Sequence, residues 1–167
     1  MMPIIHDRRS LASTIGLFIL NFSTLDLFVQ DYLENNLTTE EFARFKNQPF
    51  QKRIERIQQH VQQPGFDPKK RAEFERLSLR VEGIRGIRNH LAHGLLCASI
   101  NEDTKEWRLT ISLPRDLDGS NAPDVMHLTF EELLKTSKEL TDLIDDFKRW
   151  TGGWVTDWEG VVERRES

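Results

Sequence analysis

The stretch from Ile87 to Gly94 holds the residue types of this sequence that are best suited to acid–base chemistry. It reads IRNHLAHG and contains Arg88, Asn89 and His93. The guanidinium of Arg88 is a permanent cation, whereas the imidazole of His93 exchanges a proton near neutral pH. On a helix, these two residues lie about 1.4 turns apart. The neighbouring amide of Asn89 can orient either group.

These groups match the needs of RNA cleavage without a metal ion. The reaction requires a base for the 2′-hydroxyl, an acid for the leaving oxygen, and a cation for the charged phosphorane. His93 can act as acid or base, and Arg88 as the cation. Because one motif supplies one such histidine, two copies facing each other across a two-fold axis would complete a site. In the competing structural interpretation, Arg88 pairs with a buried carboxylate and His93 ends its helix, where the dipole favours a cation.

The six residues from Arg88 to His93 (RNHLAH) resemble the R-x4-6-H signature of the HEPN superfamily, in the form where a polar residue follows the arginine. The segment Gly16–Leu25 is also similar to the first helix of some HEPN proteins. In architecture, the resemblance covers about residues 10–150. It implies an all-α fold, usually dimeric, in which two copies of the motif meet in a cleft at the interface.

The resemblance also implies an activity and a setting. Many HEPN proteins are metal-independent endoribonucleases of toxin–antitoxin, abortive-infection and CRISPR-linked defence systems, and others are inactive binding or scaffolding domains. By this resemblance Arg88 and His93 are catalytic, Asn89 supports them, and an antitoxin or another regulatory protein is an expected partner. One subgroup is controlled by adenylylation of a tyrosine two residues past the histidine. This chain has Leu95 there, so that control is not expected.

Other ionisable side chains near the motif are candidates for ligand binding. His90 and His93 are three residues apart on one helix, close enough to share a metal ion. No third ligand is recognisable nearby, so we expect no metal site and no cofactor. We expect His90, Arg85 and Arg80 to contact RNA, the arginines through its phosphates. Further basic residues flank the motif helix: Lys52, Arg53, Arg56, Lys69, Lys70, Arg71 and Arg76.

Helical spacing of apolar residues predicts the elements that position the motif. Spacings of three and four between Leu11 and Tyr32 indicate a long first helix that ends at Asn36. Four more apolar residues would widen its buried stripe, namely Leu17, Leu20, Phe28 and Leu33. In the motif helix Arg88 occupies the apolar seam, where a charge is costly without a partner.

Local signals predict where the other helices begin. Capping boxes are formed by Thr38 with Glu41 and by Thr129 with Glu132. The pair Asp67-Pro68 is an N-cap followed by proline at the first helical position, which starts the motif helix. Between them, a seam of Phe50, Ile54, Ile57 and Val61 predicts one more helix. The expected buried stripe of the last helix is Phe130, Leu133, Leu134, Leu140, Leu143, Ile144 and Phe147.

After Gly94 the pattern alternates at period two, which predicts a β-hairpin over about residues 95–113. Residues 114–124 are expected to form a loop. The predicted fold is therefore mainly all-α: a four-to-five-helix HEPN-like bundle with a hairpin inserted before the last long helix. We expect one domain over residues 1–167, with a core at about 10–150 and a tail from 151 that carries Trp154 and Trp158.

Composition and charge narrow the class of protein. With 38% apolar and 30% charged residues, the 167-residue chain is not a membrane bundle, a collagenous chain or a disordered tail. Its one cysteine, Cys97, allows no internal disulfide. Arg8-Arg9 before an apolar run resembles a secretion signal, but no small-x-small site follows, so we interpret the run as a core helix of a cytoplasmic protein.

The net charge of −4 is unevenly distributed along the chain. Residues 51–95 carry ten Lys and Arg against five Asp and Glu, which is typical either of solvated helix faces or of one anionic ligand site. We favour a homodimeric endoribonuclease that cleaves single-stranded RNA and has no membrane partner. The alternatives are a catalytically inactive helical module that binds RNA or a protein, and a bundle with a small-molecule pocket.

Overall fold

The computed structural model describes residues 8–113 and 124–152. In these ranges five helices and three strands follow in the order α1 (Arg8–Asn36), α2 (Thr39–Phe45), α3 (Phe50–Val61), α4 (Pro68–His93), β1 (Leu95–Ile100), β2 (Trp107–Ser112), β3 (Val125–Thr129) and α5 (Phe130–Trp150). The mainly helical class is thus confirmed, as is a hairpin before the last helix. Residues 1–7, 114–123 and 153–167, including Trp154 and Trp158, lie outside the described residues.

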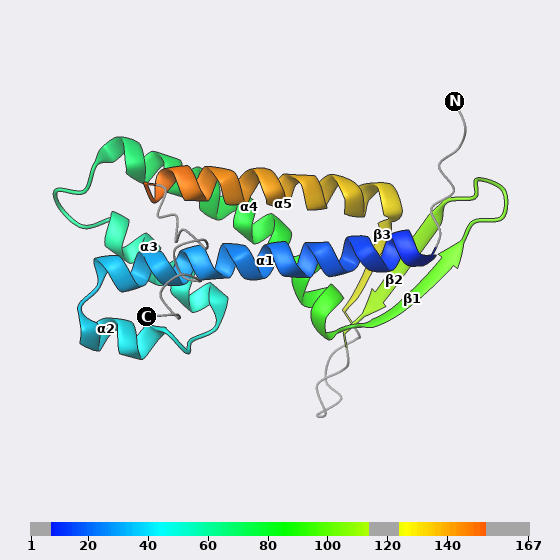
Figure 1. The fold of residues 1–167 in the computed structure, drawn as a ribbon, viewed down its shortest axis with the longest axis horizontal. Helices are drawn as coiled ribbons and strands as arrows, with labels where there is room; N and C mark the ends of the chain where they lie inside the picture. Colours follow the sequence, from blue (N-terminus) through cyan, green and yellow to red (C-terminus); the bar gives the residue numbers. More distant parts are fainter. Residues whose placement is uncertain (1–7, 114–123, 153–167) are drawn as a thin grey trace, which may run out of the picture.

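The helices form a bundle with the sheet at one end. Figure 1 shows α1 and α5 side by side, both starting at the sheet end, while α2 lies at the opposite end. The helix α4 packs against both and runs the opposite way, so that its last residues reach the sheet. The topology therefore places His93 at the junction between the bundle and the sheet.

The helix α1 contributes one buried seam to the core. Seven of its side chains are buried, among them Phe18, Leu25 and Val29, none of which is exposed to solvent. The prediction that Leu17 and Leu20 widen this stripe is wrong, because they are 54% and 65% exposed. The physical reason is that the bundle covers α1 from one side only. By length and composition α1 is also apolar enough to cross a membrane, a property that buried core helices and signal sequences share.

The predicted helix starts are confirmed. Thr38 with Glu41 and Thr129 with Glu132 form complete capping boxes, and the Asp67 side chain caps α4 before Pro68. In α5 the expected burial of Leu134 is wrong, since it is 40% exposed, whereas Trp150 lies in the core. Its indole Nε1 donates a hydrogen bond to the Lys70 carbonyl, 2.8 Å away. This contact ties the end of α5 to the start of α4.

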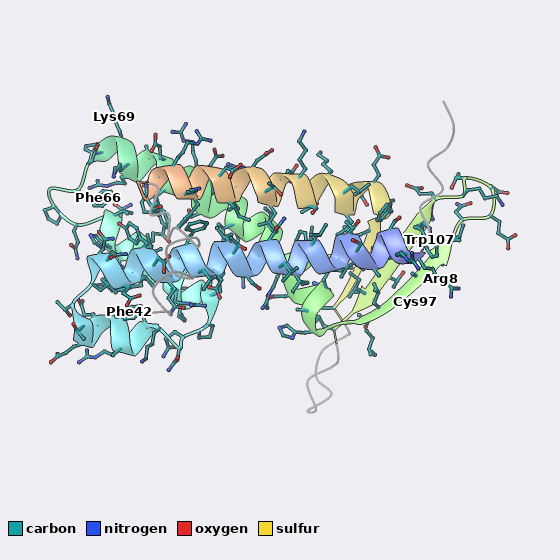
Figure 2. All side chains as sticks on the ribbon, in the orientation of Figure 1. Arg8, Phe42, Phe66, Lys69, Cys97 and Trp107 are labelled. Atoms are coloured by element: carbon teal, nitrogen blue, oxygen red, sulfur yellow. The ribbon has the colours of Figure 1, made fainter. Side chains whose placement is uncertain are left out.

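The sheet is antiparallel, in the order β1-β2-β3. The third strand was not predicted, because its five residues alternate too briefly to be distinguished from a loop. On β2, Trp107, Leu109 and Ile111 are buried on one face, as the alternation predicted. Figure 2 shows Trp107 at the sheet end of the molecule, where α1 begins at Arg8. The strand β1 is an edge strand whose six residues are all exposed.

The change from helix to strand after His93 depends on Gly94. Its N–H donates to the His90 carbonyl over 2.7 Å and closes the last turn of α4. A Cβ at this position would lie 2.5 Å from Cγ2 of Ile111 and 2.6 Å from the His90 carbonyl oxygen. A residue with a side chain therefore does not fit between α4 and β2.

Candidate active site

Arg88 and His93 are in direct contact. Nη1 of Arg88 lies 3.2 Å from Nε2 of His93 and donates to Oδ1 of Asn89 over 3.3 Å. Because a guanidinium can only donate, Nε2 of His93 is the acceptor in this contact. The imidazole is exposed and lies next to a fixed cation, to which the lone pair of its Nε2 is hydrogen-bonded.

The guanidinium of Arg88 is supported by an aromatic ring instead of a carboxylate. Its Cζ lies 5.4 Å from the ring centroid of Phe22, within the range of a cation–π contact. Within the described ranges no Asp or Glu forms an ion pair with Arg88. The expected buried carboxylate partner is therefore not found there, and the positive charge of Arg88 is left available to an anion.

The contact pair opens onto a groove of about 640 Å³ between α1, α3 and α4. Three arginines line it: Arg53, Arg85 and Arg88. The remaining lining residues are Phe22, Asp26, Asn47, Gln48, Pro49, Phe50, Gln51, Asn89, His93 and Leu113. A groove with three cations and one carboxylate among its lining residues favours an anionic ligand.

Arg53 and Asp26 form an ion pair in the wall of this groove. Nη2 of Arg53 lies 2.7 Å from Oδ2 and 2.6 Å from Oδ1 of Asp26, and the arginine side chain is 9% exposed. By residue type, Arg53 is recognisable only as one of the basic residues that flank the motif helix, and nothing in the sequence singles out Asp26. The spacing does indicate that Arg53 is unusual, because it lies three residues after Phe50 and therefore on the apolar stripe of α3.

The three residues expected to contact RNA are not brought together. Arg85 lines the groove and pairs with Glu82, with Nη2 and Oε1 2.5 Å apart. That hydrogen bond lowers the pKa of the Glu82 carboxyl. Arg80 faces α5, where its Nη1 lies 2.5 Å from Oδ2 of Asp146. Arg80 therefore does not belong to the groove.

His90 also lies outside the groove, because it is 5% exposed and faces the sheet junction. Its Nδ1 is 2.9 Å from the Gly86 carbonyl oxygen, to which it donates. Its Nε2 is 3.3 Å from Oδ2 of Asp124 without the alignment of a hydrogen bond. Of the two histidines in the motif, only His93 is thus available to a ligand of this groove.

The described residues contain no group of three His, Cys, Asp or Glu side chains arranged to hold a metal ion. In comparisons with known proteins, no family model, curated protein or solved structure matches this chain.

Proposed function

We propose that this chain is a metal-independent endoribonuclease of the HEPN type that cleaves single-stranded RNA. The observation that carries the proposal is the contact of 3.2 Å between Arg88 and His93 at an open, cationic groove. The mainly helical fold and the RNHLAH motif at the end of a long helix support it. The same resemblance implies a cytoplasmic toxin–antitoxin or phage-defence setting, in which an antitoxin or other regulatory protein would restrain the enzyme.

The chemistry follows from the protonation state of the pair. When the guanidinium of Arg88 leaves Nε2 of His93 for a phosphoryl oxygen of the RNA, the freed lone pair on Nε2 takes the proton of the 2′-hydroxyl, and the 2′-oxygen then bonds to phosphorus. Arg88 stabilises the negative charge that develops on the phosphoryl oxygens, in place of a metal ion. The bond from phosphorus to the 5′-oxygen breaks, which leaves a 2′,3′-cyclic phosphate on one product and a 5′-hydroxyl on the other.

The leaving 5′-oxygen requires a proton, and His93 is the single histidine that lines the groove in the described part of the chain. We therefore propose that the enzyme is a homodimer in which His93 of the second copy, protonated once RNA has drawn Arg88 away from it, supplies this proton. The same observation favours the second candidate function, an inactive module that binds RNA or a partner protein. A single groove that binds without cutting needs Arg88 but no second acid.

Cleavage of a labelled single-stranded RNA in EDTA tests the proposal. We expect wild type to leave 2′,3′-cyclic phosphate ends and His93→Ala to be inactive, while His127→Ala cuts like wild type. His127 is a matched control, because it is an exposed histidine on β3 outside the groove. A folded wild type that cuts no RNA of a varied panel supports the binding module, and equal cutting by His93→Ala overturns the proposed site.

A further inference from the structure

One end of the groove has a chemistry that phosphate binding does not require. Phe50 lies in its wall, partly buried, with its ring centroid 4.9 Å from that of Phe22. Three amide side chains, Asn47, Gln48 and Gln51, line the groove around it. An anion site needs cations and N–H donors, whereas this end offers an aromatic face and groups that both donate and accept.

Hydrogen bonds order the backbone that carries these side chains. Two backbone hydrogen bonds form the turn between α2 and α3. Lys46 N–H donates to the Phe42 carbonyl over 2.8 Å, and Gln48 N–H donates to the Phe45 carbonyl over 3.0 Å. Pro49 then begins α3 with φ near −53°, and its carbonyl accepts from Lys52 N–H over 2.9 Å. The amide-bearing turn is therefore positioned before any ligand binds, which lowers the entropic cost of recognition.

The cations of α4 and the amides that line the groove come from different elements, and Phe22 lies between them, with its ring centroid 5.4 Å from Cζ of Arg88 and 4.9 Å from that of Phe50. The cations Arg85 and Arg88 come from α4, together with His93. The carboxylate among the lining residues, Asp26, is already paired with Arg53. The turn that carries the amides therefore adds no free charge to the described lining. The whole groove, at about 640 Å³, lies within the range of about 300–1,000 Å³ that is usual for small-ligand sites.

Gln51 provides a further indication. Its Nε2 donates to Glu55 over 3.4 Å, while its buried Oε1 has no hydrogen-bond partner in the described structure. Unsatisfied buried acceptors are uncommon in folded proteins. Because this oxygen is shielded from solvent in the free protein, the exocyclic amino group of a base reaches it only after the Gln51 side chain rotates into the groove.

From these observations we propose that Phe50 and the amides of Asn47, Gln48 and Gln51 form a nucleobase subsite. Phe50 stacks on the base, and the amides bond to its edge, as in other single-strand readers. The base belongs to the nucleotide whose phosphate is held by Arg88. This inference rests on the proposed function for the identity of its ligand, and it extends that function from phosphate binding to reading of a base.

Binding of nucleoside 5′-monophosphates to the whole chain tests the subsite separately from catalysis, since these ligands hold no phosphodiester to cleave. Ribose 5-phosphate is the matched control ligand, because it has the phosphate and the sugar but no base. We expect each nucleotide that binds to do so more tightly than ribose 5-phosphate. Phe50→Ala should weaken nucleotide binding by about 5- to 150-fold. Binding of ribose 5-phosphate should stay unchanged.

Because Phe50 also packs against the core, two further variants keep the test independent of folding. Phe50→Leu keeps most of the apolar volume without the aromatic face and should weaken nucleotide binding, whereas Phe50→Trp should preserve it. Phe42→Leu is the matched control, a partly buried phenylalanine on α2, at the end of the molecule away from the sheet (Figure 2) and outside the groove lining.

Equal affinities for nucleotides and ribose 5-phosphate, wild-type binding by Phe50→Leu, or no nucleotide binding at millimolar concentrations would overturn the subsite. The two proposals fail separately. If RNA is cleaved and nucleotide binding ignores Phe50, the subsite is wrong and the nuclease stands. If Phe50-dependent binding is found without RNA cleavage, the subsite stands and catalysis is wrong.

Discussion

Nη1 of Arg88 lies 3.2 Å from Nε2 of His93, although the two residues are separated by more than one turn of α4. The helix continues through His93 and ends at Gly94, so both side chains leave the same rigid element. The arginine is the donor in this contact and Nε2 of the histidine is the acceptor. In the proposed mechanism, this same nitrogen takes the 2′-hydroxyl proton after the guanidinium has moved to the phosphate.

Replacing Arg88 with glutamine should reduce RNA cleavage by about 10²–10³-fold, the usual cost of removing one donor that stabilises transition-state charge. Arg88→Lys should recover part of this loss, because it restores the charge without the planar fork. Arg76→Gln makes the same chemical change on an exposed residue of α4 outside the groove. Single-turnover rates would measure the effect, and an Arg88→Gln rate equal to that of the control would contradict it.

The salt dependence of RNA binding should distinguish Arg85 from Arg80. Arg85 lines the groove, while Arg80 is paired with Asp146 on the side of α4 that faces α5. Arg85→Ala should reduce the slope of log Kobs against log salt concentration by about 1, the amount expected for one lost phosphate contact. Arg80→Ala should leave the slope unchanged. Equal slopes for both variants and wild type would exclude Arg85 as a phosphate contact.

Gly94→Ala should lower the free energy of unfolding by about 1–3 kcal/mol, the usual cost of forcing a methyl group into packed surroundings. The neighbouring atoms include the backbone oxygen of His90, which cannot rotate away. Gly86→Ala is the matched control, because it lies inside α4 with no atom within 4 Å of an added Cβ. It should stabilise by about 0.5–1 kcal/mol. Urea denaturation measures both, and a neutral Gly94→Ala would show that α4 and β2 can separate there.

The pair of Arg53 and Asp26 should show a measurable energetic coupling. Asp26→Asn leaves the arginine, whose side chain is 9% exposed, without its counter-charge and should cost about 1–3 kcal/mol. In the Arg53→Met background the same change should cost less. The double-mutant cycle in urea is then expected to give a coupling of about 0.5–3 kcal/mol. Additive effects would mean that solvent already screens the pair.

Stability should fall below neutral pH because of His60. Burial between Tyr32 and Phe66, followed by the charge of Arg56, lowers the pKa of this imidazole, and the carboxylate of Glu41 opposes the shift to a smaller extent. A lowered folded-state pKa means that the unfolded chain binds more protons in this range. The contribution of His60 to the free energy of unfolding is therefore fully present above the pKa of an unfolded histidine, about 6.5. It is lost as the pH falls through the lower pKa of the folded state.

The variant His60→Gln isolates this contribution. Unfolding free energies of wild type and variant, measured in urea at pH values from neutral to 5, should converge as the pH falls. Carboxylates that titrate in the same range are common to both proteins and cancel in the difference. A difference that stays constant with pH would exclude His60 as the source.

Local sequence signals were sufficient for the helix starts. The capping boxes of Thr38 and Thr129 are satisfied within one turn, so no tertiary contact is needed to form them. Helical geometry likewise sets the separation of Arg88 and His93. That separation is about 140° around the helix, so it does not by itself bring the two side chains together, and their contact is seen only in the structure.

Other features depended on which elements pack together. The strand β3 becomes a strand by pairing with β2, and Leu17, Leu20 and Leu134 are exposed because no element covers their side of the helix. Arg80 and Arg85 look alike in sequence, yet they face opposite sides of α4.

The sequence by itself determined the helices, their ends and the spacing of the reactive pair, because those properties depend on bonds between near neighbours. Only the tertiary structure decided that Asp26, Phe50 and Arg53, from α1 and α3, would share a groove with His93. The reason is physical: a groove is the space left between packed helices, and its lining depends on how the helices rotate and pack against each other.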